Sequence, residues 1–194
     1  MLAASAGGIR ALNTVLRGLP SAFPVPIIIV QHRGAGSTIE LARAIGRDTT
    51  FLVKDAQEGE RMRRQVVYLA PPDRHLLLAP DGSFAHSDGP KVKFSRPSAD
   101  VLFESVARRF GSGVLGVILT GADGDGADGA RDIKAHGGQV IAQDLETAEF
   151  IGMPWSAMAA HSVDFIVPLE KIGATIVALL AETSRRVHQG ISSP

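Results

Sequence analysis

The sequence predicts an α/β fold: a doubly wound, mostly parallel sheet with helices on both faces and one antiparallel β-hairpin. Short apolar runs of strand length alternate with longer segments whose apolar residues recur every three or four positions. This alternation is typical of βα units, in which a helix returns the chain to the start of the next parallel strand. The hairpin is predicted separately, because Asp81-Gly82 separates two short apolar runs.

The predicted strands are short runs rich in aliphatic and β-branched residues. Residues 25–31 form the clearest one, because their run of β-branched residues indicates a buried strand. The others are expected at 51–54, 65–70, 75–79, 84–86, 114–119, 139–143 and 164–167. Residues 1–4 are short for a central strand, which favours a chain that is a piece of a longer protein.

Helices are predicted wherever apolar residues repeat at helical spacing between these strands. The first follows Gly8, with Ile9, Leu12, Leu16 and Leu19 in register. Further helices are expected at 37–46, 98–110, from the end of the 120–128 loop to about His136, at about 154–160 and at 170–187, with Ser37 and Ser98 as N-caps.

The composition excludes several classes of protein. The 194 residues are 45% hydrophobic, enough for a single domain over 1–194, with a flexible tail from about 185 to 194. Twenty basic residues balance twenty acidic ones, so we expect no nucleic-acid partner. We expect no membrane insertion, because no apolar run approaches the roughly 20 residues needed to span a bilayer. Cysteine is absent, which excludes disulfides and cysteine-based metal sites. Because the sequence shows no signal peptide, we expect a cytoplasmic protein.

Ser5 is a candidate nucleophile. It lies between a strand end and a helix start, within the run Ala-Ser-Ala-Gly-Gly at residues 4–8. A hydroxyl is exposed at such a turn, and the backbone N–H groups of the new helix point outward. The N–H groups of Ala6, Gly7 and Gly8 are therefore candidates for stabilising an oxyanion.

His32 is the candidate general base. A lone histidine is more often structural than catalytic, but His32 directly follows the buried run at 25–31, where ligands bind in parallel sheets. His75 is the second choice, and the remaining histidines resemble surface residues.

The glycine-rich loop at 120–128 offers three acids for orienting His32. It lacks the glutamate of a calcium loop and the Gly-Lys of a phosphate-binding loop. A histidine that takes a proton from serine needs a carboxylate on its other nitrogen. Spacing alone leaves Asp123, Asp125 and Asp128 as alternatives, beside the simpler interpretation of a turn whose acids cap a helix.

Several further segments occur in a specific order. They are Ala-Ser-Ala-Gly-Gly at 4–8, Gln31-His32, Tyr-Leu-Ala-Pro-Pro-Asp-Arg-His at 68–75, Arg-Pro-Ser-Ala-Asp-Val-Leu-Phe at 96–103, Gly-Val-Ile-Leu-Thr-Gly at 116–121, Asp-Gly-Ala at 125–127 and Gly-Met-Pro at 152–154. Together they resemble the catalytic domain of CheB, the chemoreceptor protein-glutamate methylesterase, from Ala4 to about Leu180.

The resemblance implies that Ser5 is the nucleophile, His32 the general base and Asp125 the orienting acid. The implied reaction hydrolyses glutamyl methyl esters on cytoplasmic chemoreceptor helices in two acyl-transfer steps, releases methanol, and needs no metal or organic cofactor. Many family members also deamidate receptor glutamines. The alternative from another class is a catalytically weak interaction module of a signalling protein.

The chain departs from the family pattern at two positions of the loop. The family loop commonly reads Thr-Gly-Met-Gly-x-Asp-Gly, whereas Ala122 and Asp123 stand in place of the Met and the second Gly. We expect Ala122 to open the wall of the site and to be a further candidate near the substrate, and Asp123 to add a charge. CheB enzymes usually carry a receiver domain as well, for which this chain has no room. A receiver or another signalling domain is thus an expected partner in a longer chain.

Overall fold

The computed structural model describes residues 1–32, 38–47 and 49–190. The strands are β1 (Leu2–Ala4), β2 (Ile27–Gln31), β3 (Leu52–Asp55), β4 (Val66–Leu69), β5 (His75–Leu78), β6 (Phe84–Ser87), β7 (Leu115–Ile118), β8 (Gln139–Gln143) and β9 (Phe165–Val167). The helices are α1 (Gly8–Arg17), α2 (Thr38–Gly46), α3 (Ala99–Phe110), α4 (Ala127–Ala135), α5 (Gly152–Ala159) and α6 (Leu169–Gly190), with a 3-10 turn at Gly111–Gly113.

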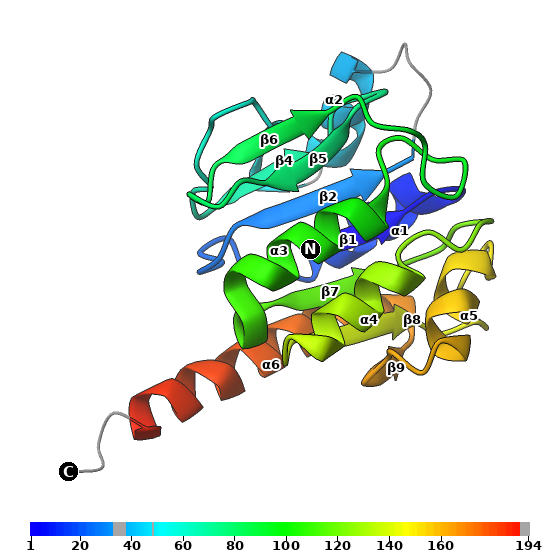
Figure 1. The fold of residues 1–194 in the computed structure, drawn as a ribbon. Helices are drawn as coiled ribbons and strands as arrows, with labels where there is room; N and C mark the ends of the chain where they lie inside the picture. Colours follow the sequence, from blue (N-terminus) through cyan, green and yellow to red (C-terminus); the bar gives the residue numbers. More distant parts are fainter. Residues whose placement is uncertain (33–37, 48, 191–194) are drawn as a thin grey trace.

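A seven-stranded sheet of order β3-β4-β2-β1-β7-β8-β9 forms the centre of the fold (Figure 1). All its strand pairs are parallel, and β5 and β6 form a separate antiparallel pair. The predicted fold class is therefore confirmed. The chain starts in the middle of the sheet at β1, adds strands on one side, and then crosses to β7 on the other. Ligands bind at such a reversal of strand order, beyond the carboxyl ends of the strands.

Alternate residues of the strands face two separate layers of helices. Ile27 and Ile29 of β2 pack with the apolar residues of α1, α2 and α6. Ile28 and Val30 pack on the opposite face with α3, α4 and α5. Figure 1 shows α3 and α4 side by side across this second face. Burial on both faces explains why β2 reads as an unbroken apolar run.

The short strand β1 lies at the centre of the sheet. Leu2 pairs with Ile29 on one side and Val117 on the other, and Ala3 and Ala4 are fully buried. Pairing on both edges satisfies the backbone groups of so short a strand.

Several predicted helix boundaries differ from those observed. α4 begins at Ala127 inside the predicted loop, α5 begins at Gly152, and α6 continues through Gly190. Ser37, predicted as the N-cap of α2, lies outside the described residues.

Ser98 occupies the N-cap position of α3, but the prediction that its side chain caps the helix is wrong. Its hydroxyl donates instead to the Asp125 carboxylate, which takes over the capping. Within the described ranges, none of the helices is long and apolar enough to cross a membrane.

Candidate active site

Ser5 lies where the central strand β1 turns into α1. Its N–H donates to the carbonyl of Thr120 over 3.0 Å, and its own carbonyl accepts from Gly8 over 2.9 Å. Between them Gly7 adopts a left-handed conformation with φ of 74°, which favours glycine. A Cβ at Gly7 would also lie 2.9 Å from the Glu149 carboxylate. The turn therefore needs glycine for both its backbone angle and its close neighbour.

His32 follows β2, the strand beside β1. Ala4 and Gln31 are register partners, so Ser5 and His32 are the next residues on two adjacent strands. The His32 N–H donates to the Ala4 carbonyl over 3.0 Å. The predicted meeting of these two residues at one edge of the sheet follows from parallel pairing.

The side chain of Gln31 connects Ser5 to His32. Its buried side-chain amide donates to the carbonyl of Ser5 over 2.8 Å and to the carbonyl of His32 over 3.0 Å. A Cβ at Gly8 would overlap the Gln31 side chain, so this clamp also requires glycine there. In the sequence, Gln31 stands out only as part of the Gln31-His32 motif. A polar residue ending an otherwise apolar buried strand was the available signal for its positioning role.

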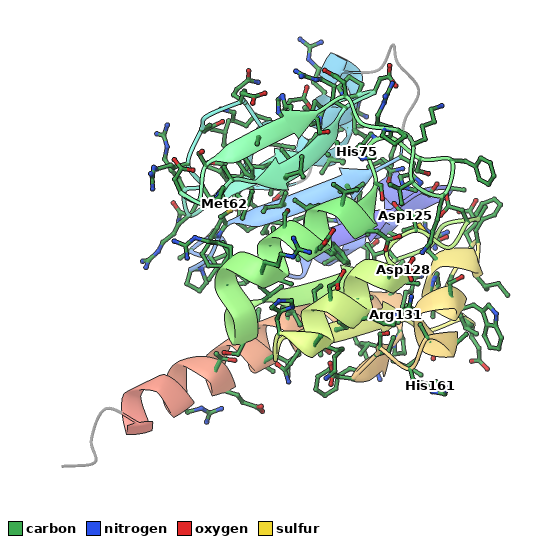
Figure 2. All side chains as sticks on the ribbon, in the orientation of Figure 1. Met62, His75, Asp125, Asp128, Arg131 and His161 are labelled. Carbon is green, nitrogen blue, oxygen red and sulfur yellow. The ribbon has the colours of Figure 1, made fainter. Side chains whose placement is uncertain are left out.

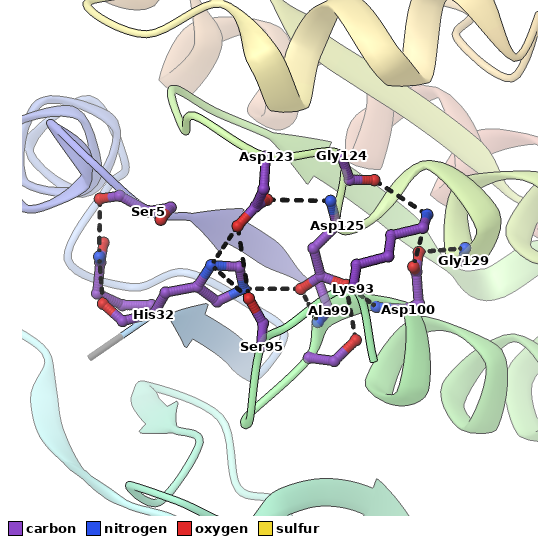
Figure 3. A network of polar contacts seen from close by, with 12 residues as sticks. Ser5, His32, Lys93, Ser95, Ala99, Asp100, Asp123, Gly124, Asp125 and Gly129 are labelled. Atoms are coloured by element: carbon purple, nitrogen blue, oxygen red, sulfur yellow. Dashed lines mark hydrogen bonds and ion pairs between the residues drawn. The ribbon is translucent and has the colours of Figure 1, made fainter. Parts of the chain in front are cut away.

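Asp125 is the acid that binds the Nε2 nitrogen of the His32 ring. Its carboxylate lies 2.7 Å from His32 Nε2 and is fully buried (Figure 3). It also accepts hydrogen bonds from the Ser98 hydroxyl at 2.6 Å and from the backbone of Ala99 and Asp100 at 2.5 and 3.2 Å. Asp125 thus sits at the positive N-terminus of α3.

The environment of Asp125 favours its ionised form. Burial alone raises the pKa of this carboxyl, but the hydrogen bonds from His32, Ser98 and Ala99 outweigh burial and lower its pKa below the ordinary value. A permanently charged carboxylate beside the imidazole fixes the ring orientation and stabilises its protonated form.

A second carboxylate binds the other ring nitrogen. Asp123 lies 3.2 Å from His32 Nδ1, and the Ser95 hydroxyl lies 3.3 Å from the same nitrogen. Burial lowers the pKa of His32, but the contacts with Asp123 and Asp125 outweigh it and raise the pKa to about 9. The imidazole is therefore protonated at neutral pH. Ser5 Oγ makes no hydrogen bond to any other residue that the structure describes.

Lys93 shapes the acidic loop from outside it. Its ammonium forms ion pairs with Asp100 at 2.9 Å and Asp128 at 2.8 Å, and it donates a hydrogen bond to the Gly124 carbonyl at 3.0 Å (Figure 3). Asp128 also pairs with Arg131. Of the three loop acids left open by spacing, Asp123 and Asp125 contact His32, whereas Asp128 faces these cations.

The oxyanion candidates differ in their available donors. The Gly8 N–H is committed to the Ser5 carbonyl. The N–H groups of Ala6, Gly7 and Ala122 donate to no residue within the described part of the chain. These three N–H groups therefore remain candidates for binding an oxyanion near Ser5.

His75, the second choice for the base, is a structural residue. It is buried, its Nε2 lies 3.0 Å from the Pro90 carbonyl, and its Nδ1 accepts from the Ser98 N–H at 3.2 Å. In Figure 2 it lies apart from His161, which is near β9 at the far edge of the sheet. Across the described ranges, no cluster of three or more His, Cys, Asp or Glu side chains is arranged to hold a metal.

Gly121 gives a first test of how tightly the site is packed. A Cβ there would lie 3.0 Å from Ser5 Cβ and would overlap the Met153 side chain. We expect Gly121→Ala to lower kcat by about 10²-fold through displacement of Ser5, and to destabilise the fold by about 1–3 kcal/mol. Ester hydrolysis and thermal unfolding measure the two effects.

Gly113→Ala is the matched control, because a Cβ at Gly113 would meet nothing within 4 Å. If both alanine variants behave like the wild type, the close packing around Gly121 does not position Ser5.

Comparison with known proteins shows which family the chain is similar to. The profile described as CheB methylesterase matches residues 1–176. A Leptospira interrogans relative named for protein-glutamate methylesterase and protein-glutamine glutaminase activities is 46% identical over 92% of this chain and 93% of its own length. A Methanosarcina mazei protein-glutamate methylesterase/protein-glutamine glutaminase is 39% identical over 92% of this chain and 51% of its own length.

The fold also matches a solved structure. The crystal structure of the Thermotoga maritima CheB methylesterase catalytic domain aligns with a TM-score of 0.88 and 37% sequence identity, covering 92% of this chain and 96% of that one. The chain thus spans nearly the whole Leptospira relative but about half of the Methanosarcina one.

Proposed function

Because the chain belongs to the CheB methylesterase family, we propose that it hydrolyses the methyl esters of glutamate residues on the cytoplasmic helices of chemoreceptors. The observation that carries the proposal is the contact of His32 with the buried Asp125, one strand away from Ser5 at the reversal of strand order. A nucleophile, a base and an orienting acid at this edge of a parallel sheet support acyl transfer.

The proposed reaction has two steps. Neutral His32 takes the proton of the Ser5 hydroxyl as its oxygen attacks the ester carbonyl, and His32 then returns the proton to the departing methoxide, which leaves as methanol. Water hydrolyses the resulting acyl-enzyme by the same route and regenerates Ser5. The free N–H groups of Ala6, Gly7 and Ala122 are suited to bind the negative oxygen that forms in each step.

The same acyl-enzyme can form from a glutamine side chain. In that case the proton from His32 goes to the departing amide nitrogen, and ammonia leaves instead of methanol. The names of the relatives, which pair methylesterase with glutaminase, support this second activity.

Exposed apolar side chains near the site support a protein substrate. Phe94, which is 95% exposed, precedes the Ser95 that contacts His32. Phe150 and Ile151 are also exposed, and the Phe150 carbonyl accepts from the Gly121 N–H at the edge of the site. Apolar groups of this size on a surface are typical of contacts with another protein. They suit the apolar side of a receptor helix.

Phe94→Ala tests this docking role. We expect KM for a methylated receptor fragment to rise by about tenfold, because a buried aromatic contact is worth about 1.5–3 kcal/mol. Hydrolysis of a small glutamyl methyl ester should not change, since it is too short to reach Phe94. An equal change with both substrates would mean that Phe94 acts on the site rather than on receptor binding.

The function itself is tested by methanol release from methylated cytoplasmic receptor fragments, with ammonia release from the glutamine forms measured in parallel. We expect methanol release to depend on enzyme concentration and to stop when the ester is exhausted. His32 loses its proton at a pH of about 9. Tight binding of the fragment without turnover at any pH from 6 to about 9 would instead support the alternative function, a catalytically weak interaction module.

A further inference from the structure

Both nitrogens of the His32 ring face carboxylates. Nε2 lies 2.7 Å from Asp125, and Nδ1 lies 3.2 Å from Asp123 (Figure 3). A histidine that activates a serine uses one nitrogen for the orienting acid and the other for the hydroxyl. With Asp125 on Nε2, the nitrogen that remains for Ser5 is Nδ1, and Asp123 occupies it.

Asp123 is held in this position from its own loop. One carboxylate oxygen accepts the Asp125 N–H at 3.0 Å, and the other faces His32 and the Ser95 hydroxyl, which donates to it over 3.4 Å. Burial raises the pKa of Asp123, but the contacts with His32 and the Asp125 N–H outweigh burial and lower it. The Asp123 carboxylate is therefore ionised, and its contact with protonated His32 is an ion pair.

We propose that Asp123 is a positioning residue that holds the His32 imidazolium away from Ser5 in the free enzyme, so that attack by Ser5 requires this ion pair to open. The inference rests on the proposed esterase function of the site. It assigns to Asp123 the opposite effect from Asp125: Asp125 prepares His32 to accept a proton, whereas Asp123 competes with Ser5 for the nitrogen that must accept it.

Substitution of Asp123 tests the proposal, because it removes one charge from the His32 ring and leaves Asp125 in place. Among the described residues, the groups that form ion pairs or hydrogen bonds with the His32 ring are the carboxylates of Asp123 and Asp125 and the neutral hydroxyl of Ser95. The ammonium of Lys93 lies in the same network but pairs with Asp100 and Asp128. Loss of Asp125 would also remove the orienting acid, so Asp123 can be tested without dismantling the catalytic set.

The ion pair has a direct consequence for the pH dependence of the reaction. His32 must be neutral to act as a base, and its pKa is raised to about 9. At pH 7 only about 1% of such a group is neutral. The acid limb of kcat/KM reports the free enzyme, so kcat/KM should rise with pH through neutrality and level off above about pH 9.

The test compares the wild type with Asp123→Gly and Asp123→Asn. For each protein, kcat/KM for a methylated receptor fragment is measured from pH 5.5 to about 10, and His32 is titrated by ¹⁵N NMR without substrate. Removal of the Asp123 charge should lower both midpoints by about one pH unit or more, and should raise kcat/KM at pH 7 by about tenfold. The Asn variant retains an acceptor for the Asp125 N–H, which separates the charge from the shape of the loop.

Glu149→Gln is the matched control. It removes a carboxylate that lies close to Gly7, next to Ser5, whereas the described carboxylates that pair with His32 are those of Asp123 and Asp125, so its midpoints should remain those of the wild type. Midpoints that stay unchanged in both Asp123 variants, or a wild-type His32 that titrates near its ordinary value, would overturn the proposal. The NMR titration requires no turnover, so it decides the role of Asp123 even if the fragment is not hydrolysed and the esterase function fails.

Discussion

Ser5→Ala should reduce methanol release from methylated receptor fragments by about 10⁴-fold or more, because no other hydroxyl can form the acyl-enzyme at this turn. The loss should be in kcat, since the apolar surface proposed to bind a receptor helix is intact. Stability should hardly change, because the Ser5 hydroxyl makes no hydrogen bond to another described residue. Initial rates across substrate concentrations and a thermal melt measure both quantities.

Ser21→Ala is the control for this substitution. Ser21 is exposed ahead of β2, and its backbone carbonyl accepts a hydrogen bond from the Gln65 side chain. Its activity should equal that of the wild type. Substantial methanol release by Ser5→Ala would show that the ester is attacked directly by water or by another nucleophile.

Asp125→Asn should lower kcat by about 10⁴-fold while the protein stays folded. An amide in place of the carboxylate cannot stabilise the protonated imidazole, and it favours the wrong tautomer of the ring. The same substitution removes a charge that accepts hydrogen bonds from Ser98, Ala99 and Asp100 at the start of α3. We therefore also expect a loss of about 1–3 kcal/mol in the free energy of unfolding.

Asp128→Asn is the control that distinguishes an acid that contacts His32 from a loop acid that pairs only with cations. It removes a carboxylate from the same loop that pairs with Lys93 and Arg131 and does not contact His32. Its kcat should fall far less than that of Asp125→Asn. Equal losses in the two variants would assign the effect to the folding of the loop instead of to the orientation of His32.

Asp125 and His32 both make the stability of the fold depend on pH, but in opposite directions. The pKa of Asp125 lies below its unfolded value of 3.8, so its stabilising effect is present above that pH and is lost on acidification. The pKa of His32 is raised from 6.5 to about 9, so its effect is complete below 6.5 and is lost as pH rises through 9. The active, neutral state of His32 is therefore the less stabilised one.

The architecture of the sheet could be predicted because burial leaves a direct pattern in the sequence. The run of β-branched residues in β2 indicated a buried strand, and in the structure Ile27 to Val30 alternate between two helix layers. Parallel pairing then placed Ser5 and His32 at one edge, since each follows its own strand. The local hairpin at Asp81-Gly82 needed only a turn signal.

The details of the acidic loop could not be predicted in this way. Asp123, Asp125 and Asp128 lie within six residues, and spacing does not say which faces the histidine. The path of the loop depends on Lys93, about thirty positions earlier in the chain, through its contacts with Gly124 and Asp128. Ser98 was misjudged for a related reason, because the buried Asp125 competes for its hydroxyl. Only the resemblance to the family pointed to Asp125.

Covalent labelling tests most directly whether Ser5, His32 and Asp125 form a serine hydrolase site. The protein would be treated with a fluorophosphonate ester, which adds to activated serines, and the adduct mapped by peptide mass spectrometry. We predict a single adduct, on Ser5, whose formation slows by orders of magnitude in His32→Gln and Asp125→Asn. Methanol release by a protein that acquires no adduct on Ser5, or an adduct that forms equally fast in both variants, would contradict the account.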